Sequence, residues 1–459
     1  MFRRILIANR GEIAVRIIRA CIEMNIETVA VYSTADKECL HVKLATQAVC
    51  IGPAKAADSY LNMKSILTAA VETNCDAIHP GFGFLSENSE FARLCEECNI
   101  KFIGPKADVI DAMGNKAMAK TMMRNGNVPV VPGSIGALKD YAEAEKIADE
   151  VGYPVLLKAS AGGGGRGMRR AESREQLESA YEEAKAEARA CFGNDEMYLE
   201  KLIINPRHIE FQILADEFGN VVHLGERDCS IQRKNQKLIE ESPCMLLSEE
   251  LRTKMGDAAV NAAKASGYTN AGTVEFVLDE KENFYFIEMN TRIQVEHGVT
   301  EMVTGIDLVK EQIRIAFHQP LTFTQDDVHL NGHAMECRIN AEDPAKGFMP
   351  NSGKISFLNL PGGPGVRVDT LLYNGYETSP FYDSMMAKII VHAPTRLEMI
   401  RKMRRALMEL STEGITTTSD FDYLILFHPD FIKGKFNVGF IEEHMEEILT
   451  WDAFGEGDE

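Results

Sequence analysis

The stretch Arg4-Ile5-Leu6-Ile7-Ala8-Asn9-Arg10-Gly11-Glu12-Ile13-Ala14 sets the architecture of the first hundred residues. A short apolar run ends in a glycine turn and passes into a second apolar pattern with helical spacing. The alternation continues, with apolar runs at Thr28–Tyr32, Ala77–Ile78 and Lys101–Ile103 and a helical pattern at Leu61–Val71. Strands that alternate with helices predict βαβ units and a parallel sheet. Because ligands of such sheets bind beyond the carboxyl ends of the strands, the glycine turns are candidate binding surfaces.

The sequence beyond about Asn115 has a different texture. Longer strand-like runs join through short turns, as between Ile209–Ala215 and Val221–Leu224. Such hairpins predict an antiparallel sheet, so we expect an α+β part after the α/β part. From about Gly332, a third region mixes strand-like runs with a basic helical pattern at Arg396–Leu410.

Length and composition limit the class of protein. The chain has 459 residues, 45% of them hydrophobic, which is enough for two or three domains with their own cores. A formal net charge of −20 argues against broad binding to nucleic acid or anionic membranes. The sequence has no apolar run as long as a membrane span, and no signal-peptide core follows Met1. Ten scattered cysteines lack the dense spacing of a disulfide framework, and Cys95 and Cys98 lack a second pair for zinc. We therefore expect a cytoplasmic protein.

The most distinctive local pattern is Phe286-Ile287-Glu288-Met289-Asn290-Thr291-Arg292-Ile293-Gln294-Val295-Glu296-His297. If this segment is extended, every even position from Glu288 to Glu296 is polar and projects to one side. The apolar residues between them project to the other side, toward a core. A surface strand also alternates, but it seldom carries Glu, Asn, Arg, Gln and Glu in succession. The segment therefore predicts a strand with one core face and one dense polar site.

Two residues of this segment are candidate metal ligands. Glu288 and Asn290 are two positions apart and can reach one hard cation, and a neighbouring hairpin strand supplies Glu275. Magnesium that accompanies nucleotide phosphates is usually bound in this sparse way, by one or two carboxylates and phosphate oxygens. The pattern indicates a metal–nucleotide site.

A glycine-rich segment, Ala159-Ser160-Ala161-Gly162-Gly163-Gly164-Gly165-Arg166-Gly167, follows the strand-like run Val155–Lys158. Consecutive glycines let backbone N–H groups close on phosphates, and Lys158 can meet their negative oxygens. The segment is neither a Walker A loop nor a dinucleotide fingerprint, because the terminal Lys-Ser/Thr is missing and a strand follows. A flexible hairpin is the alternative interpretation.

Two charged clusters stand out in this acidic chain. They are Glu226-Arg227-Asp228-Cys229-Ser230-Ile231-Gln232-Arg233-Lys234-Asn235-Gln236-Lys237 and Gly332-His333-Ala334-Met335-Glu336-Cys337-Arg338-Ile339-Asn340-Ala341-Glu342-Asp343. Concentrated Arg and Lys suit a pocket for bicarbonate, phosphate and nucleotide. Either cluster could equally be a solvated run of salt bridges.

These motifs together resemble one known family. The chain resembles biotin carboxylase, a member of the ATP-grasp enzymes, from Ile5 nearly to its C-terminus. The most specific matches are His79-Pro80-Gly81-Phe82-Gly83-Phe84-Leu85-Ser86-Glu87-Asn88, the tetraglycine segment, Glu288–Glu296 and Glu336–Asp343. The resemblance implies a Rossmann-like N-terminal domain (1–114), an ATP-grasp domain (115–330) with a glycine-rich lid (about 131–204), a mixed C-terminal domain (331–446) and an acidic tail (447–459).

The resemblance also assigns site residues, position by position. The implied magnesium (or manganese) ligands are Glu275, Glu288 and Asn290. The implied bicarbonate site comprises Lys237, Arg292 and the backbone near Val295, with Glu296 as the base and Arg338 facing biotin. The implied nucleotide contacts are Lys116, Lys158, Gly164, Gly165, Glu200, Lys201, Leu202, Ile203, His208, Asn235, Glu275 and Glu288.

The implied reaction uses ATP and bicarbonate to carboxylate biotin through carboxyphosphate. Because the sequence has no Met-Lys-Met attachment motif, we expect biotin to arrive on a separate biotin carboxyl carrier protein. Carboxyltransferase subunits and a second copy of the chain are further expected partners. Acetyl-CoA carboxylase is the first expectation for the whole system, with pyruvate or propionyl-CoA carboxylase as alternatives. Another ATP-grasp ligase and a catalytically silent subunit are the rival readings.

Four positions depart from the pattern expected of the family. Asn115 stands where Asp often precedes the lysine, Asn235 where His is frequent, Phe82 where Tyr is common and Gly298 where Pro usually follows Glu-His. None of these changes removes a proposed ligand or base. The residue at 235 leaves one nucleotide contact open, and Gly298 is expected to loosen a strand end beside Glu296, since glycine has more backbone freedom than proline.

Overall fold

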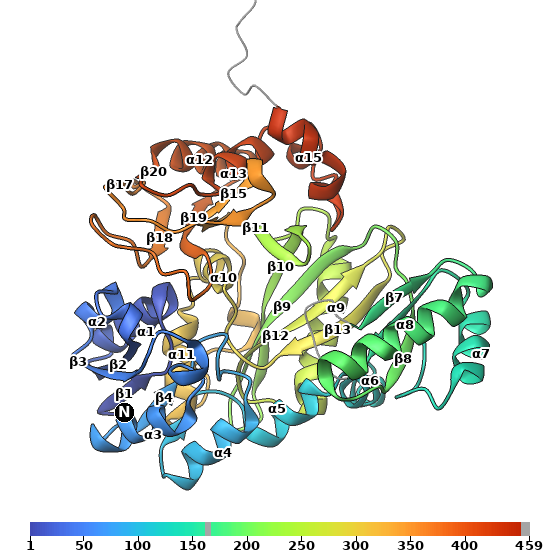
Figure 1. Cartoon of the computed structure of the whole chain (residues 1–459), viewed down its shortest axis with the longest axis horizontal. Helices are drawn as coiled ribbons and strands as arrows, with labels where there is room; N and C mark the ends of the chain where they lie inside the picture. The colour runs from blue at the N-terminus through green and yellow to red at the C-terminus, as the bar shows by residue number, and fades with distance from the viewer. Residues whose placement is uncertain (161–166, 451–459) are drawn as a thin grey trace, which may run out of the picture.

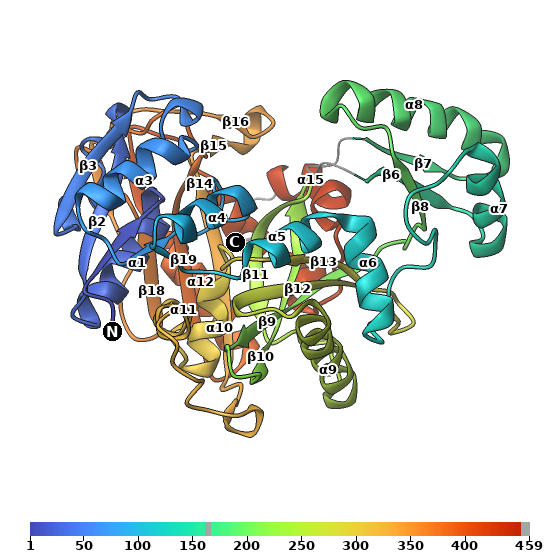
Figure 2. The ribbon, with the colours of Figure 1, turned by 90° about the horizontal axis from the view of Figure 1, so that it is seen from below.

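The computed structural model describes residues 1–160 and 167–450. The predicted contacts of Gly164 and Gly165 lie outside the described residues, as do positions 451–459 of the predicted tail. Figure 1 shows the chain in three parts, with the blue N-terminal part below the orange and red C-terminal part and the green lid to the right. Figure 2, seen from below, shows that the lid projects away from the other two parts.

The first part is a parallel sheet, as the alternation of apolar runs and helical patterns predicts. Five of the described strands pair in the order β3-β2-β1-β4-β5, which is the Rossmann-like order. Their bounds are β1 (Arg4–Ile7), β2 (Glu27–Ser33), β3 (Gln47–Gly52), β4 (Ala77–His79) and β5 (Lys101–Phe102). The helices are α1 (Gly11–Glu23), α2 (Leu40–Leu44), α3 (Met63–Glu72), α4 (Ser89–Glu97) and α5 (Ala107–Gly114). The sequence analysis did not predict β3, a mostly exposed edge strand without a continuous apolar run.

The turns that follow β1 and β4 meet at one edge of this sheet. The two strands are parallel neighbours, with Ile7 opposite His79. The side-chain amide of Asn9 donates to the carbonyl oxygens of Pro80 and Phe82, both at 2.7 Å. The predicted binding surface is therefore one continuous edge, joined by a buried asparagine.

The second and third parts share one antiparallel sheet. Eight of the described strands pair in the order β13-β12-β9-β10-β11-β14-β19-β18. Their bounds are β9 (Arg207–Ala215), β10 (Val221–Arg233), β11 (Gln236–Ser242), β12 (Asn270–Leu278), β13 (Phe284–Asn290), β14 (His333–Asn340), β18 (Val366–Thr370) and β19 (Met385–Ala393). The predicted hairpin is confirmed as β9 and β10. Because β14 pairs with β11, the sheet continues without a break from the central into the C-terminal part.

Helices cover this sheet with apolar faces. One core joins α9 to β9, β12 and β13, through residues such as Met255, Phe211 and Phe276. Another joins α12 to β14 and β19, through residues such as Met403, Cys337 and Ile389. The bounds of these helices and their neighbours are α9 (Glu249–Ser266), α10 (His297–Thr304), α11 (Leu308–Ala316), α12 (Arg396–Glu409), α13 (Ser419–Ile425), α14 (Pro429–Ile432) and α15 (Phe440–Thr450).

The lid has its own small sheet and core. The strands pair in the order β7-β6-β8, all antiparallel, and α7 and α8 pack against them. The bounds are α7 (Tyr141–Val151), β6 (Val155–Ala159), β7 (Met168–Ala171), α8 (Arg174–Phe192) and β8 (Met197–Lys201), preceded by α6 (Lys116–Asn125). The predicted strand after the glycine segment is thus confirmed as β7. A separate core lets the lid keep its structure as a unit.

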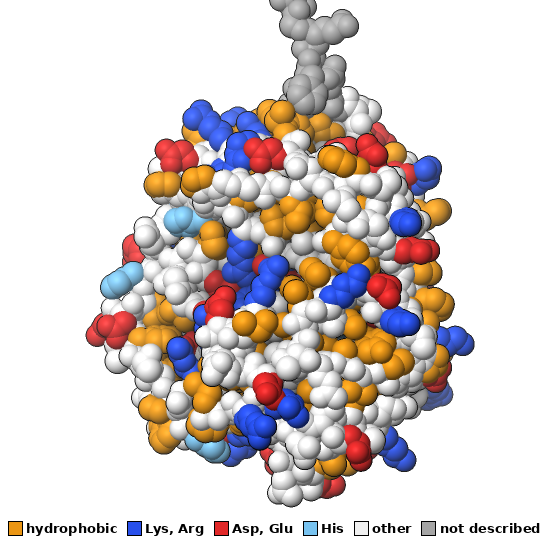
Figure 3. All heavy atoms as spheres, turned by 90° about the vertical axis from the view of Figure 1, so that its left-hand side faces the viewer, with side chains coloured by type: hydrophobic (Ala, Val, Ile, Leu, Met, Phe, Trp, Pro, Cys, Tyr) orange, Lys and Arg blue, Asp and Glu red, His pale blue; other side chains and the backbone are white. Residues whose placement is uncertain are grey.

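The remaining elements are short. They are β15 (Glu342–Asp343), β16 (Met349–Pro350), β17 (Phe357–Asn359) and β20 (Ser411–Glu413). Across residues 1–160 and 167–450, no helix combines the length and the apolar character needed to cross a membrane. On the face shown in Figure 3, hydrophobic side chains are interspersed with basic and acidic ones.

Candidate active site

One cavity of about 1180 Å³ lies where the three parts and the lid converge. It collects residues that are far apart in the sequence, from Asn9 to Val438. All sixteen of the predicted site residues that the structure describes line it: Lys116, Lys158, Glu200, Lys201, Leu202, Ile203, His208, Asn235, Lys237, Glu275, Glu288, Asn290, Arg292, Val295, Glu296 and Arg338. The fold therefore brings the predicted nucleotide, metal, bicarbonate and biotin residues into a single space.

The lid side of the cavity carries a cluster of lysines around one buried carboxylate. Lys158, at the end of β6, lies 2.6 Å from Glu200 on the neighbouring strand β8. Lys120, one turn after Lys116 on α6, contacts the same carboxylate. Lys116 itself lies 3.7 Å from Glu288 across the cavity. Two ammonium groups held by one glutamate at a cavity wall are well suited to meet phosphate oxygens.

The segment after β8 contributes its backbone rather than its lysine side chain. The ammonium group of Lys201 donates to the carbonyl oxygens of Gly152 and Tyr153, at 2.9 and 2.7 Å. The N–H of Leu202 donates to Pro154 at 3.0 Å. A nucleotide contact of Lys201 would therefore use its main chain, because its side chain is engaged within the lid.

The predicted metal ligands face one another across two paired strands. Glu275 of β12 is directly opposite Glu288 of β13, and the amide of Asn290 donates to Glu275 at 2.8 Å. Burial and the neighbouring charge of Glu275 raise the pKa of Glu288. Burial also opposes ionisation of Glu275, but Lys237 and His208 outweigh it and lower the pKa of that carboxyl. Facing carboxylates beside an amide form an oxygen-rich site that fits Mg²⁺ or Mn²⁺.

The prediction of one extended strand from 286 to 296 is wrong beyond Asn290. β13 ends at Asn290, and the chain then bends before α10 begins at His297. Ionic and hydrogen-bonding partners draw the segment out of the sheet, since Glu87 accepts from the Arg292 side chain at 2.9 Å and from the Thr291 N–H at 3.1 Å. The polar residues still line the cavity, but they do so from a bent loop rather than from one face of a strand.

Three oppositely charged groups meet at the closed end of the cavity. Lys237 lies 2.5 Å from one carboxylate oxygen of Glu296, and Arg338 lies 2.9 Å from the other. Burial opposes ionisation of Glu296, but these cations outweigh it and hold the pKa of Glu296 well below its usual range. The carboxyl is therefore ionised at neutral pH, as a group that accepts a proton must be.

Arg338 also contacts a second buried carboxyl. Its guanidinium donates to Glu240 at 2.6 Å, and Glu240 is fully buried on β11. Burial raises the pKa of Glu240 to about 7, although Arg338 works in the opposite direction. Glu240 lies directly opposite Glu336 of β14, another buried carboxyl. This end of the cavity thus holds a carboxyl that titrates near neutral pH.

The backbone at Val295 is supported from behind. Its carbonyl oxygen accepts a hydrogen bond of 2.6 Å from Lys388, whose side chain is fully buried on β19. Lys388 is also 3.5 Å from Glu12 of α1. The loop before α10 is therefore connected to both the N-terminal and the C-terminal parts.

Several residues of the site were missed in the sequence analysis. Glu87 lies within the His79–Asn88 motif, so its position beside a glycine turn was the available signal. Glu210 and Gln212 follow His208 on β9 at a spacing of two, which places them on the same face. This periodicity could have found both. Arg227 and Gln294 were quoted within motifs, but their contacts with other elements are not visible in a local pattern.

Comparisons with known proteins match this arrangement along the whole chain. Three family models match: "Biotin carboxylase, N-terminal domain" at residues 1–110, "Carbamoyl-phosphate synthase L chain, ATP binding domain" at 115–324 and "Biotin carboxylase C-terminal domain" at 336–443. Biotin carboxylase 1 of Bacillus subtilis is 56% identical over 99% of this chain and 100% of its own length. The chain belongs to the biotin carboxylase family.

Solved structures agree with this membership. A biotin carboxylase from Campylobacter jejuni, in a β,γ-ATP complex, has a TM-score of 0.94 and 50% identity over 97% of this chain and 99% of its own. The biotin carboxylase domain dimer of Hydrogenobacter thermophilus 2-oxoglutarate carboxylase, in complex with MgADP, ADP and bicarbonate, has a TM-score of 0.93 and 53% identity over 98% of this chain and 99% of its own. As a biotin carboxylase, the protein is an ATP-grasp ligase that uses ATP, Mg²⁺ and biotin.

Two departures from the expected biotin carboxylase pattern have a structural reason. Asn115 is the N-cap of α6, and its side chain accepts from the Met118 N–H at 3.0 Å, as an aspartate would. Asn235 has a φ of +64° in the turn between β10 and β11, beside Lys234 with a φ of +49°. Asparagine is favoured in this left-handed conformation. The choice of Asn235 thus suits the tight turn that carries Lys237.

The other two departures lie beside the bent loop and the sheet edge. Gly298 lies in the first turn of α10 rather than at a strand end, so the expectation of a loosened strand is wrong. A Cβ atom at this position would lie 2.3 Å from the end of the buried Ile390 side chain. Phe82 is half-buried, and its side chain packs against the core below the N-terminal sheet.

Proposed function

We propose that the cavity carries out the ATP- and bicarbonate-dependent carboxylation of biotin on a separate carrier protein, through carboxyphosphate. The carrying observation is the ionised, buried Glu296 between Lys237 and Arg338. A base flanked by two cations can accept a proton from bicarbonate while those cations bind the resulting anion. A silent subunit would have no need to keep this costly buried cluster.

The nucleotide would lie between the lid and the large sheet. In this proposal Lys116, Lys158 and the backbone of 201–203 bind it, with His208 and Asn235 at its border and residues 131–204 acting as a lid. Glu275, Glu288 and Asn290 hold Mg²⁺ or Mn²⁺, which supplies charge neutralisation on the phosphate oxygens when bound. The clustering of Lys158 and Lys120 around Glu200 supports this placement.

Bicarbonate would bind at the closed end. Lys237, Arg292 and the backbone of Val295 orient it, and Glu296 accepts its proton. The oxygen freed of its proton attacks the γ-phosphorus of ATP, the bond from that phosphorus to the bridging oxygen breaks, and ADP leaves with the electron pair. The short contact between Lys237 and Glu296 supports this order, because the ammonium group can exchange one carboxylate for another.

Biotin would be carboxylated next to Arg338. Carboxyphosphate breaks down to CO2 and phosphate, and the phosphate takes the ureido N–H proton of biotin. Arg338 stabilises the developing ureido anion, which then attacks CO2. A closed lid would exclude the water that destroys carboxyphosphate. The position of Arg338 at the far side of Glu296 from Lys237 supports separate roles for the two cations.

For the final acceptor we propose acetyl-CoA, which makes this the first half-reaction of malonyl-CoA formation in fatty acid biosynthesis. The support is the relative of full equal length from Bacillus subtilis, which is named simply biotin carboxylase. The similar Hydrogenobacter protein is named for 2-oxoglutarate carboxylase, so a pyruvate or propionyl-CoA carboxylase is the alternative. We also propose carboxyltransferase subunits and a biotin carboxyl carrier protein as partners.

The proposal includes a homodimer in the cytoplasm. The Hydrogenobacter domain was solved as a dimer, and the face in Figure 3 mixes hydrophobic and charged side chains as protein interfaces do. The ten cysteines are all free thiols, as expected in a reducing compartment.

The test is ADP release from the purified protein with Mg²⁺, ATP and labelled bicarbonate, with and without free biotin. Biotin-stimulated ADP release with label in trapped carboxybiotin supports the proposal. ATP cleavage without labelled biotin would favour another ATP-grasp ligase, and absence of cleavage would favour a silent subunit. Repeating the assay with the purified carrier and carboxyltransferase and each candidate acceptor identifies the acceptor.

A further inference from the structure

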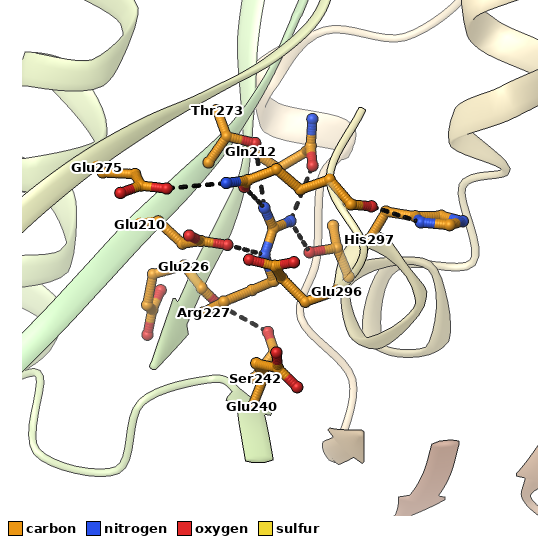
Figure 4. Close-up of polar contacts among 12 residues, drawn as sticks. Glu210, Gln212, Glu226, Arg227, Glu240, Ser242, Thr273, Glu275, Glu296 and His297 are labelled. Atoms are coloured by element: carbon orange, nitrogen blue, oxygen red, sulfur yellow. Dashed lines mark hydrogen bonds and ion pairs between the residues drawn. The ribbon is translucent and has the colours of Figure 1, made fainter. Parts of the chain in front are cut away.

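Arg227 lies beneath the cavity at the centre of a buried hydrogen-bond cluster (Figure 4). Its side chain, on β10, is fully buried, and Arg227 does not line the cavity within the described part of the chain. A guanidinium has five N–H donors, and in the described structure it makes five hydrogen bonds. The acceptors are Glu210 (2.5 Å), Gln212 (2.8 Å), Thr300 (2.9 Å), Gln294 (2.9 Å) and Thr273 (3.1 Å).

These acceptors come from separate elements of the fold. Glu210 and Gln212 belong to β9, and Thr273 belongs to β12. Gln294 lies in the bent loop after β13, and Thr300 lies on α10. One side chain therefore connects three strands of the large sheet with the loop and the helix that flank Glu296.

Two of the acceptors pass the connection on to the cavity. Glu210 uses one carboxylate oxygen for Arg227 and the other for Lys237, at 2.6 Å. Gln294 accepts from Arg227 through its carbonyl oxygen and donates through its amide to Glu275 at 2.8 Å. Lys237 and Glu275 are thus each one residue removed from the guanidinium. Figure 4 also shows the Glu296 carboxylate close beside Arg227.

The chemistry of this cluster demands arginine. The acceptors surround a planar, delocalised cation that presents its donors in a fixed fork. A lysine would keep the charge, but it has three donors, so at least two buried acceptors would lose their partner. Glu210 is as buried as Arg227, so its charge also depends on this pair.

We propose that Arg227 is a positioning residue for the bicarbonate end of the active site. It holds Glu210 and Gln294 so that Lys237 and Glu275 keep their directions, and it touches no substrate itself. The inference rests on the bicarbonate role proposed above for Lys237, Arg292, Val295 and Glu296. Removing the guanidinium fork should therefore weaken the use of bicarbonate far more than the binding of ATP at the lid.

The test compares Arg227→Lys with Arg396→Lys, a matched change at another buried arginine. Arg396 donates to both oxygens of Glu241, at 2.6 and 2.8 Å, and does not line the cavity in the described chain. For Arg227→Lys we expect the KM for bicarbonate to rise about tenfold or more, with the KM for ATP within about twofold. For Arg396→Lys we expect both constants to stay at the level of the unaltered protein. The assay is labelled carboxybiotin formation, with the thermal unfolding midpoint of each variant measured in parallel.

A second variant covers the case in which Arg227→Lys does not fold. Thr300→Val keeps the shape of the side chain and removes one acceptor of Arg227 from α10, outside the cavity. We expect a rise of about threefold in the KM for bicarbonate and an unchanged KM for ATP.

The outcomes separate the two proposals. Wild-type bicarbonate constants in a folded Arg227→Lys protein would overturn the positioning role, as would equal rises in both constants. If Arg227→Lys does not fold, an unchanged KM for bicarbonate in Thr300→Val would overturn it. Failure of the unaltered protein to form labelled carboxybiotin would instead overturn the proposed function, and the positioning role with it.

Discussion

The ammonium nitrogen of Lys237 lies 2.5 Å from a carboxylate oxygen of Glu296. The pair is buried, and the same lysine also contacts Glu210 at 2.6 Å. A buried lysine with two carboxylate partners keeps its proton, while Glu296 keeps its charge. The two groups are thus prepared for opposite roles toward one substrate, a cation that binds it and a base that takes its proton.

Glu296→Gln removes the base and leaves the nucleotide side of the cavity intact. We expect turnover to fall by about two to four orders of magnitude, because an amide accepts no proton at neutral pH. The dissociation constant for MgATP should stay within about twofold, since binding then depends on uniform contacts elsewhere. Carboxybiotin formation and nucleotide binding measure the two effects. Unchanged turnover would exclude Glu296 as the base, and Glu296→Asp, with a shorter carboxylate, should retain part of the activity.

Arg338→Ala separates biotin carboxylation from ATP cleavage. Because Arg338 faces away from the lid and contacts only carboxyl groups at the closed end, the variant should impair carboxybiotin formation more than bicarbonate-dependent ADP release. We expect the ratio of the two rates to fall by about tenfold or more. Both rates are measured on the same samples. An equal loss in both would contradict the assignment of Arg338 to biotin.

Glu288→Gln tests the metal site. Magnesium chelation should abolish both ADP release and carboxybiotin formation. Removal of one of two carboxylates should raise the magnesium concentration for half-maximal activity by about tenfold or more. The matched control is Glu280→Gln, an exposed carboxylate in the turn between β12 and β13, which should leave the magnesium requirement unchanged. A normal requirement in Glu288→Gln would remove Glu288 from the metal site.

Glu240→Gln tests the carboxyl that titrates near neutral pH. The pKa of Glu240 is raised from the ordinary 4.5 to about 7, so the folded protein binds a proton here that the unfolded chain does not. This contribution to stability is fully present below pH 4.5 and is lost as the pH rises toward 7. Glutamine stays neutral and keeps an oxygen for Arg338. The free energy of unfolding of the variant, relative to the unaltered protein, should therefore increase between pH 5 and 7 and level off above it.

Denaturant unfolding across this pH range measures the difference. A difference that stays constant with pH would show that Glu240 does not carry the proton. The matched control is Glu282→Gln, at an exposed carboxylate, which should give a flat difference.

The sequence by itself determined the elements whose signals are local. Apolar runs and helical patterns predicted four of the five strands of the N-terminal sheet, because strands and helices differ in side-chain period. The spacing of Glu288 and Asn290 predicted an oxygen-rich site, which the pairing of β12 and β13 completes with Glu275. The family motifs predicted sixteen described residues that all line one cavity.

Only the tertiary structure decided how these pieces are joined. The sheet that continues from β11 into β14 and the end of β13 at Asn290 depend on partners distant in the sequence. Arg227 is the clearest case, because its sequence neighbours show only a charged run, whereas its five acceptors come from β9, β12, the bent loop and α10. Side-chain periodicity reports which face a residue occupies, but a buried hydrogen-bond cluster requires several elements to meet at one point. Folding alone supplies that meeting.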